Sequence, residues 1–364
     1  MHSALRFLAL LAMMAPATAS EVPWLADVTT PPALSDEIVT QAGRLAPLLE
    51  DRNGKPITTA AGWAEKRSAL LTSWKALLGP MPPRPAGGFT VVSSEPVGDL
   101  MRQRIRYENE PGQTLEAYLI GPADLDRAAP RSLPALVALH QTTGATIDEI
   151  AGVANPEGQQ AIGLKLARRG FVVICPKNFL WVDSPTLPGA VTAFHARYPS
   201  SLGMHKMLFD AQRAVDLLTT VPAVDPDRLG AVGHSLGAKE VLYLAAFDER
   251  IRAAVASEGG VAFPSTNWSA PWYLGEGLKT PGFTRNHHEL LALTAPRALL
   301  VIGGETGPGA ADGTRSWPLL AAAQPVYRVL GAPIRLGLLN HGQGHSIPPD
   351  AFEKMAEWLT YYLR

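Results

Sequence analysis

The segment 229–240 constrains the fold of this chain more than any other. It reads LGAVGHSLGAKE, an apolar strand that runs through Gly-x-Ser-x-Gly directly into a helical pattern. So sharp a turn forces the serine backbone into a strained conformation, and Gly233 and Gly237 leave room where strand and helix crowd together. We therefore predict a nucleophile elbow, with Ser235 at its tip and a helix over 236–247.

The same geometry predicts where negative charge can be stabilised. The N–H groups of a helix's first turn have no intrahelical acceptor, and they favour negative charge beside them. The backbone N–H of Leu236 is therefore a predicted oxyanion donor. A second donor is expected from the loop after the third predicted strand, where the N–H of Gln141 and that of Thr142 are both candidates.

Length and charge limit the classes of protein that the chain can represent. Its 364 residues, 46% of them hydrophobic and 18% charged, suit one large α/β core with an accessory region, or two ordinary domains. The net charge of −1 gives no sign of a surface for nucleic acid, so we expect no nucleic-acid partner. Cys175 is the only cysteine, which excludes an intrachain disulfide, and we expect it in a buried strand.

The N-terminus reads as a secretory signal over residues 1–20. His2 and Arg6 precede an apolar run, and small residues before Ser20 allow cleavage after Ala19 or after Ser20. We expect a secreted or periplasmic protein with no membrane association once the signal is removed. Three parts are predicted: the signal peptide 1–20, an N-terminal helical extension and linker 21–88, and the main domain 89–364.

Periodicity in the main domain predicts an α/β fold. An antiparallel hairpin comes first, and apolar strands then alternate with helical patterns, which is typical of a mostly parallel sheet covered on both faces. We expect about eight strands in a twisted sheet. The predicted strands are 101–107, 115–120, 135–140, 171–175, 228–234, 251–256, 298–302 and 334–339, and the predicted helices are 158–169, 205–219, 236–247, 317–329 and 350–363.

This order of elements resembles the α/β-hydrolase superfamily over roughly residues 90–364. Four motifs look like the secreted branch that holds dienelactone hydrolases, acetylxylan esterases and glucuronoyl esterases. They are His140-Gln141-Thr142-Thr143, the stretch 286–293, Ala295-Pro296-Arg297 and Gly344-His345. The resemblance implies an α/β-hydrolase fold and a serine carboxylic-ester hydrolase that works through an acyl-enzyme on acetylxylan-type or glucuronoyl-type esters of carbohydrate.

A serine nucleophile needs a general base, and the last predicted loop offers one. His345 follows the last strand on a glycine-rich loop that can return over the sheet edge. His341 on the same loop is the alternative base. His234, beside the nucleophile, is interpreted as a packing or substrate-contact residue, because neighbouring elbow residues point away from each other.

Two carboxylates compete for the third position of a triad. Glu258 follows the sixth predicted strand and resembles the acid of fungal glucuronoyl esterases. Asp312 follows the seventh, where most of the superfamily places its acid, and Glu305 is a third candidate. Either Glu258 or Asp312 preserves the order Ser, acid, His, so both remain open.

Substrate contacts are predicted mainly from the resemblance. Lys239 lies four residues after Ser235, at the spacing of a sugar-contacting lysine in glucuronoyl esterases, although an ion-pair role fits it equally. Trp268 belongs to a set of aromatic residues that could stack on sugar. Leu236 occupies the position of an arginine in those enzymes, which puts glucuronate specificity in doubt. The segment 181–205 reads as polar and broken, unlike the apolar lid helix of a lipase.

No cofactor or metal is expected, because the sequence has no His-Glu-x-x-His helix, paired-cysteine cluster or Gly-rich phosphate loop. Two other interpretations of the same fold remain. One is a general carboxylesterase or serine peptidase. The other is a non-catalytic binding module, since fold alone does not determine function.

Overall fold

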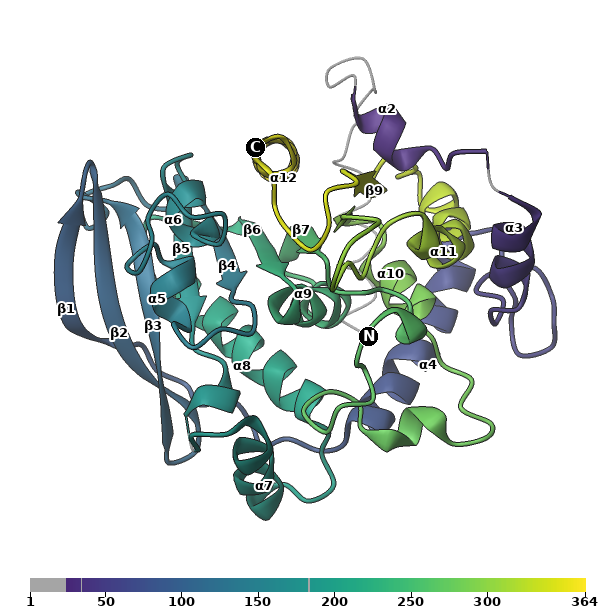
Figure 1. Cartoon of the computed structure of the whole chain (residues 1–364), viewed down its shortest axis with the longest axis horizontal. Helices are drawn as coiled ribbons and strands as arrows, with labels where there is room; N and C mark the ends of the chain where they lie inside the picture. Colours follow the sequence, from purple (N-terminus) through teal and green to yellow (C-terminus); the bar gives the residue numbers. More distant parts are fainter. Residues whose placement is uncertain (1–23, 34, 183) are drawn as a thin grey trace.

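In the part of the chain that the structure describes, nine strands form one mixed sheet with helices on both faces (Figure 1). The structure is a computed structural model and describes residues 24–33, 35–182 and 184–364. The predicted signal peptide lies outside these residues. Among the described residues, no helix is both long and apolar enough to cross a membrane.

The strand order is β1-β2-β3-β5-β4-β6-β7-β8-β9. The pairs β1–β2, β2–β3 and β3–β5 are antiparallel, and every pair from β5–β4 to β8–β9 is parallel. The carboxyl ends of the parallel strands therefore meet along one edge. The strands are β1 Thr90–Val97, β2 Leu100–Glu110, β3 Gln113–Pro122, β4 Leu133–Leu139, β5 Val172–Pro176, β6 Val224–His234, β7 Ile251–Ser257, β8 Ala298–Gly303 and β9 Leu336–Asn340.

Helices divide between the two faces of the sheet. The core on one face includes residues of α4, α7, α8, α9, α10 and α11, and the core on the other includes residues of α2, α5, α6 and α12. The helices are α2 Trp24–Thr29, α3 Asp36–Gly43, α4 Ala60–Leu78, α5 Ile147–Ile150, α6 Ile162–Ala167, α7 Leu187–Arg197, α8 Gly203–Leu218, α9 Leu236–Phe247, α10 His288–Thr294, α11 Trp317–Val329 and α12 Pro349–Tyr362, with short 3-10 turns at Phe179–Trp181, Phe263–Ser265, Glu276–Lys279 and Thr314–Ser316.

Strand β4 shows why the central strands are apolar throughout. Val137 and Leu139 face the first core, whereas Leu136 and Ala138 face the second. All four side chains are at most 2% exposed. A parallel strand covered on both faces has no solvent side, so its sequence is continuous rather than alternating.

Helix α4, in the predicted N-terminal extension, packs into the first core. Its N-terminus is capped by Thr59, whose hydroxyl accepts the N–H of Gly62 at 3.2 Å. Trp63 and Trp74 are buried, and the indole Nε1 of Trp74 donates to Glu289 on α10 at 2.6 Å. The helix therefore joins the hydrophobic core beneath the sheet.

Two elements differ from the sequence-based expectation. Strand β1 is a ninth strand that we did not predict as an element; it lies at the sheet edge with seven of its eight residues exposed, so it lacks an apolar face. The interpretation of 181–205 as a broken segment is wrong for α7. Thr186 caps that helix through the N–H of Gly189, and Pro188 occupies its first turn, where a missing N–H is tolerated.

Candidate active site

Ser235 lies in a strained turn between β6 and α9, as the Gly-x-Ser-x-Gly pattern predicts. Its φ is 57° and its ψ is −114°, a conformation that residues with a Cβ rarely adopt. The Ser235 N–H donates to the carbonyl of Ser257 on the neighbouring strand at 2.8 Å. A Cβ on Gly237 would lie 2.0 Å from the Leu139 carbonyl oxygen, so the first turn of α9 touches the end of β4 directly.

Contact between the loops after β8 and β9 positions His345. The N–H of Gly344 donates to the Gly304 carbonyl at 2.9 Å, and a Cβ on Gly304 would lie 1.8 Å from the Gly344 carbonyl oxygen. This approach requires glycine at 304. It places the His345 ring 4.7 Å, centroid to centroid, from the ring of His234, the residue before Ser235.

Glu258 is the carboxylate that reaches this imidazole. Its φ of 58° is also left-handed, and its backbone N–H donates to Ile302 on β8 at 2.8 Å. The His345 Nδ1 lies 3.3 Å from Glu258 Oε2. The carboxylate is buried and also accepts the backbone N–H groups of Gly304, Ala311 (2.5 Å) and Asp312 (3.4 Å).

Asp312 has a different set of partners. Its two carboxylate oxygens accept the N–H of Gly260 at 2.7 Å and that of Val261 at 2.8 Å, and the Ser316 hydroxyl donates at 2.7 Å. Burial raises its pKa. The two loops therefore hold each other. Asp312, in the loop after β8, binds the backbone of the loop after β7, and Glu258, in the loop after β7, binds the backbone of the loop after β8. Glu305 instead binds the N–H of Thr314 and the amide of Asn340.

The hydrogen bond expected between the predicted nucleophile, Ser235, and the predicted base, His345, is not formed in this structure. Among the described residues, Ser235 Oγ makes no hydrogen bond. Catalytic hydrogen bonds of free enzymes are often long and tighten only when substrate is bound. The backbones of Ser235 and Glu258 already have the left-handed conformation described above, so only the Ser235 side chain is without its expected partner.

The other histidines near Ser235 are poorly suited to act as its base. His234 Nδ1 lies 3.1 Å from the Ser257 hydroxyl, and burial lowers the pKa of His234 to about 3, so the ring accepts protons weakly at neutral pH. His341 uses Nδ1 to accept the N–H of Gln343, and burial lowers its pKa too.

The predicted oxyanion donors lie at the same edge. Leu236 is the first residue of α9, so its N–H has no acceptor within the helix. Gln141 is buried and Thr142 is exposed in the loop after β4. Three buried polar residues, His140, Asn178 and Glu240, support the loop after β4. The sequence analysis noted His140 only as part of the 140–143 motif and missed Asn178 and Glu240.

Lys239 and Trp268 are placed differently from a sugar-binding surface. Lys239 is 3% exposed; its ammonium donates to the Gly259 carbonyl and to the Thr266 hydroxyl, and lies 4.8 Å from the Trp268 ring centre. Burial lowers its pKa to about 8. Trp268 is 1% exposed, with Nε1 donating to the Gly260 carbonyl at 2.6 Å, so it offers no free face for stacking. Both hold the loop that follows Glu258.

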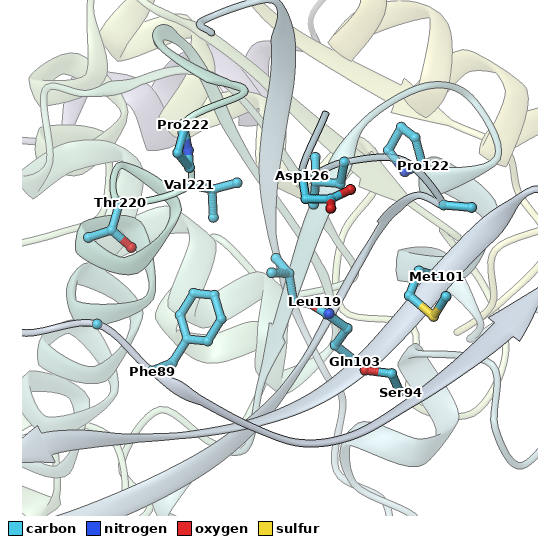
Figure 2. A pocket seen from close by; sticks show the side chains of 13 residues that line it. Phe89, Ser94, Met101, Gln103, Leu119, Pro122, Asp126, Thr220, Val221 and Pro222 are labelled. Atoms are coloured by element: carbon cyan, nitrogen blue, oxygen red, sulfur yellow. The ribbon is translucent and has the colours of Figure 1, made fainter. Parts of the chain in front are cut away.

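A groove of about 640 Å³ lies away from these residues (Figure 2). Its walls come from the antiparallel end of the sheet and from the turn after α8, with Phe89, Leu119 and Val221 among its apolar residues and Asp126 among its polar ones. No predicted site residue lines it. Within the described part of the chain, no group of three or more His, Cys, Asp or Glu side chains is arranged to hold a metal ion.

Comparison with known proteins gives the following similarities. The dienelactone hydrolase family matches residues 117–285. A 4-O-methyl-glucuronoyl methylesterase from Sodiomyces alcalophilus is 28% identical over 173 residues, which are 40% of this chain and 34% of that protein. A glucuronoyl esterase structure from Teredinibacter turnerae superposes with a TM-score of 0.70 at 22% identity, covering 98% of each chain. An acetyl xylan esterase structure from Paenibacillus sp. gives 0.56 at 16% identity, covering 89% of this chain and 99% of the other.

These matches differ in what they cover. The chain spans between about a third and a half of the length of the curated relatives that it matches in sequence. The structural matches extend over nearly the whole chain and share its fold. The chain is therefore similar to the dienelactone hydrolase family over residues 117–285, and it shares its fold with solved glucuronoyl esterases and an acetyl xylan esterase.

Proposed function

We propose that the protein is a serine carboxylic-ester hydrolase in which Ser235, His345 and Glu258 form the catalytic triad. The observation that carries this proposal is the 3.3 Å contact between Glu258 and His345 beside a serine held at positive φ. A nucleophile, a base and a group that orients the base are the parts that such a reaction needs.

The reaction proceeds in two halves. Ser235 Oγ attacks the ester carbonyl carbon while His345 Nε2 takes the hydroxyl proton, and Glu258 stabilises the imidazolium through Nδ1. The carbonyl oxygen becomes an oxyanion beside the N–H of Leu236 and an N–H of the 141–142 loop. Collapse of this intermediate expels the alcohol, which receives the proton from His345. Water activated by His345 then releases the acid from the acyl-enzyme.

Carbohydrate-linked esters are the proposed substrates, of the glucuronoyl or the acetylxylan type. The names of the similar proteins support this class. Two features of the chain argue for a site unlike that of glucuronoyl esterases: Leu236 in place of an arginine, and Lys239 already bound to Gly259 and Thr266. We further propose that the protein works outside the cytoplasm, which the apolar run within residues 1–20 supports.

Purified protein assayed on two substrates tests the proposal. One substrate is a methyl ester of a glucuronic-acid-substituted xylo-oligosaccharide, and the other is acetylated xylan, with Ser235→Ala as the inactive control. We expect turnover of at least one by the wild type and of neither by the control. Turnover of a simple aryl ester with neither carbohydrate ester hydrolysed would contradict the carbohydrate assignment while leaving the esterase chemistry intact.

A further inference from the structure

His140 occupies a buried position between two backbone segments, and its contacts define its protonation. Nδ1 lies 2.8 Å from the carbonyl oxygen of Gln141, and Nε2 lies 3.1 Å from the backbone nitrogen of Asn178. A carbonyl can only accept, so Nδ1 carries the hydrogen; an N–H can only donate, so Nε2 is bare. Burial lowers the pKa of His140 to about 4, which keeps the ring neutral at neutral pH.

The ring belongs to a chain of contacts that returns to the nucleophile's helix. The Asn178 amide donates to Glu240 Oε1 at 3.0 Å, and Glu240 lies on α9, five residues after Ser235. Burial raises the pKa of Glu240 well above its usual range. From Glu240 through Asn178 and His140 to Gln141, these buried groups connect α9 to the loop after β4.

The hydrogen bond from His140 Nδ1 to the Gln141 carbonyl determines the direction in which the backbone N–H of Thr142 points. In a trans peptide the C=O and the following N–H point to opposite sides. Since the Gln141 carbonyl points to the buried His140 ring, the Thr142 N–H points away from that ring. The backbone preceding it touches the first turn of α9, where a Cβ on Gly237 would lie 3.1 Å from the His140 carbonyl oxygen.

We propose that His140 is a positioning residue that holds the Gln141–Thr142 peptide so that the Thr142 N–H, rather than that of Gln141, is the second oxyanion donor. The proposal rests on the esterase function given above. It assigns the choice between Gln141 and Thr142, which the sequence leaves open.

Two conservative variants separate the two contacts of His140. In His140→Asn, the side-chain amide can take the place of Nδ1, which donates to the Gln141 carbonyl. In His140→Gln, the side-chain amide can take the place of Nε2, which accepts the Asn178 N–H. The substrate for both variants is p-nitrophenyl acetate. We expect kcat of His140→Asn to stay within about tenfold of wild type, and kcat of His140→Gln to be at least about tenfold lower than that of His140→Asn. KM should change little in both variants. Equal kcat values, or the reverse order, would overturn the assignment.

The donor itself can be tested at position 142. Thr142→Pro removes the N–H, and Thr142→Ala keeps it. Loss of one oxyanion donor typically lowers kcat by about 10²–10³-fold, so we expect kcat of Thr142→Pro to lie below that of Thr142→Ala by this factor. Wild-type kcat in the proline variant would rule out the Thr142 N–H.

A measurement on the unmodified protein covers the case in which a variant does not fold. With ¹⁵N-labelled histidine, NMR should show the His140 ring as neutral with hydrogen on Nδ1, with signals that do not shift between pH 8 and about pH 5.5. The His287 ring also faces a carbonyl through Nδ1, and its signals are identified by their loss in His287→Phe. A ring with hydrogen on Nε2 at this position would contradict the proposal. If wild type hydrolyses no ester at all, the proposed function fails, whereas an active wild type with an active Thr142→Pro removes only the assignment of the donor.

Discussion

Glu258 and Asp312 are both buried carboxylates at the same sheet edge, yet their contacts suit different tasks. Glu258 meets the His345 ring, whereas Asp312 binds two backbone N–H groups and a hydroxyl of Ser316. Asp312 therefore holds the backbone just after Glu258. The negative charges of both carboxylates favour the charged form of the buried Lys239 ammonium and so raise its pKa, against the larger lowering by burial.

Substituting each carboxylate by its amide distinguishes these tasks. Glu258→Gln removes the charge that stabilises the imidazolium and the correct tautomer, so we expect kcat to fall by about 10³–10⁴-fold with little change in melting temperature. Asp312→Asn places an amide NH₂ against a backbone N–H, so one hydrogen bond is lost. The free energy of unfolding should therefore fall by about 1–3 kcal/mol, and the loss of kcat should be much smaller than that of Glu258→Gln. Steady-state kinetics and thermal unfolding of both variants check this, and a larger kcat loss from Asp312→Asn would contradict the assignment.

The sequence could not decide between these two residues. Both follow strands of the parallel sheet and both keep the order of the triad. What separates them is the path of the loop 304–311, in which Gly304 must lack a Cβ to admit Gly344. That contact joins segments 40 residues apart in the sequence, so the residues around either glycine do not predict it. The buried chain from His140 to Glu240 was missed for the same reason.

At the scale of elements, the close contact between β4 and α9 brings Ser235, the proposed nucleophile, beside the 141–142 loop. Gly237 allows this contact because its missing side chain leaves space for the Leu139 carbonyl. The elbow was predictable, since its two glycines lie only two residues before and two residues after the serine in the sequence. Strand β1 and helix α7 were not, because the first has no buried face and the second begins with residues that usually break helices.

A methyl group at position 237 should separate the two elements. In Gly237→Ala the new Cβ would meet the Leu139 carbonyl oxygen at 2.0 Å, so α9 must shift. We expect a loss of about 1–3 kcal/mol in unfolding free energy and a fall in kcat of at least tenfold, because small displacements of catalytic groups are costly. Gly277→Ala is the matched control, since nothing lies within 4 Å of its Cβ. Similar behaviour of the two variants would show that the contact is unimportant.

Across the described part of the molecule, four histidines are buried, namely His140, His234, His287 and His288, and burial lowers the pKa of each. Burial lowers the pKa of His140 to about 4 and those of His234 and His287 to about 3. In the unfolded chain these groups titrate near pH 6.5. Each therefore contributes stability above pH 6.5 that is lost as the pH falls toward its folded pKa. The raised pKa values of Asp312 and Glu240 make the free energy of unfolding fall as the pH rises, which opposes the effect of the histidines. A test must therefore substitute one histidine at a time.

His287 is the clearest case because it is not one of the three proposed triad residues. Its Nδ1 faces the Val261 carbonyl at 2.8 Å, and the Tyr243 hydroxyl lies 3.0 Å from its Nε2. The difference in unfolding free energy between wild type and His287→Phe should shrink by about 1.4 kcal/mol per pH unit as the pH falls from about 6 to 4. Denaturant unfolding at several pH values measures it. A difference independent of pH would mean that His287 is protonated in the folded protein.

The central claim is that Ser235 is an activated nucleophile. Intact and peptide mass spectrometry after treatment with a fluorophosphonate probe tests it most directly, with folded Ser235→Ala as the control. We expect one adduct per wild-type chain, located on Ser235, much slower labelling of His345→Ala, and none of Ser235→Ala. A folded wild-type protein that stays unlabelled, or that carries the adduct on another residue, would contradict the account.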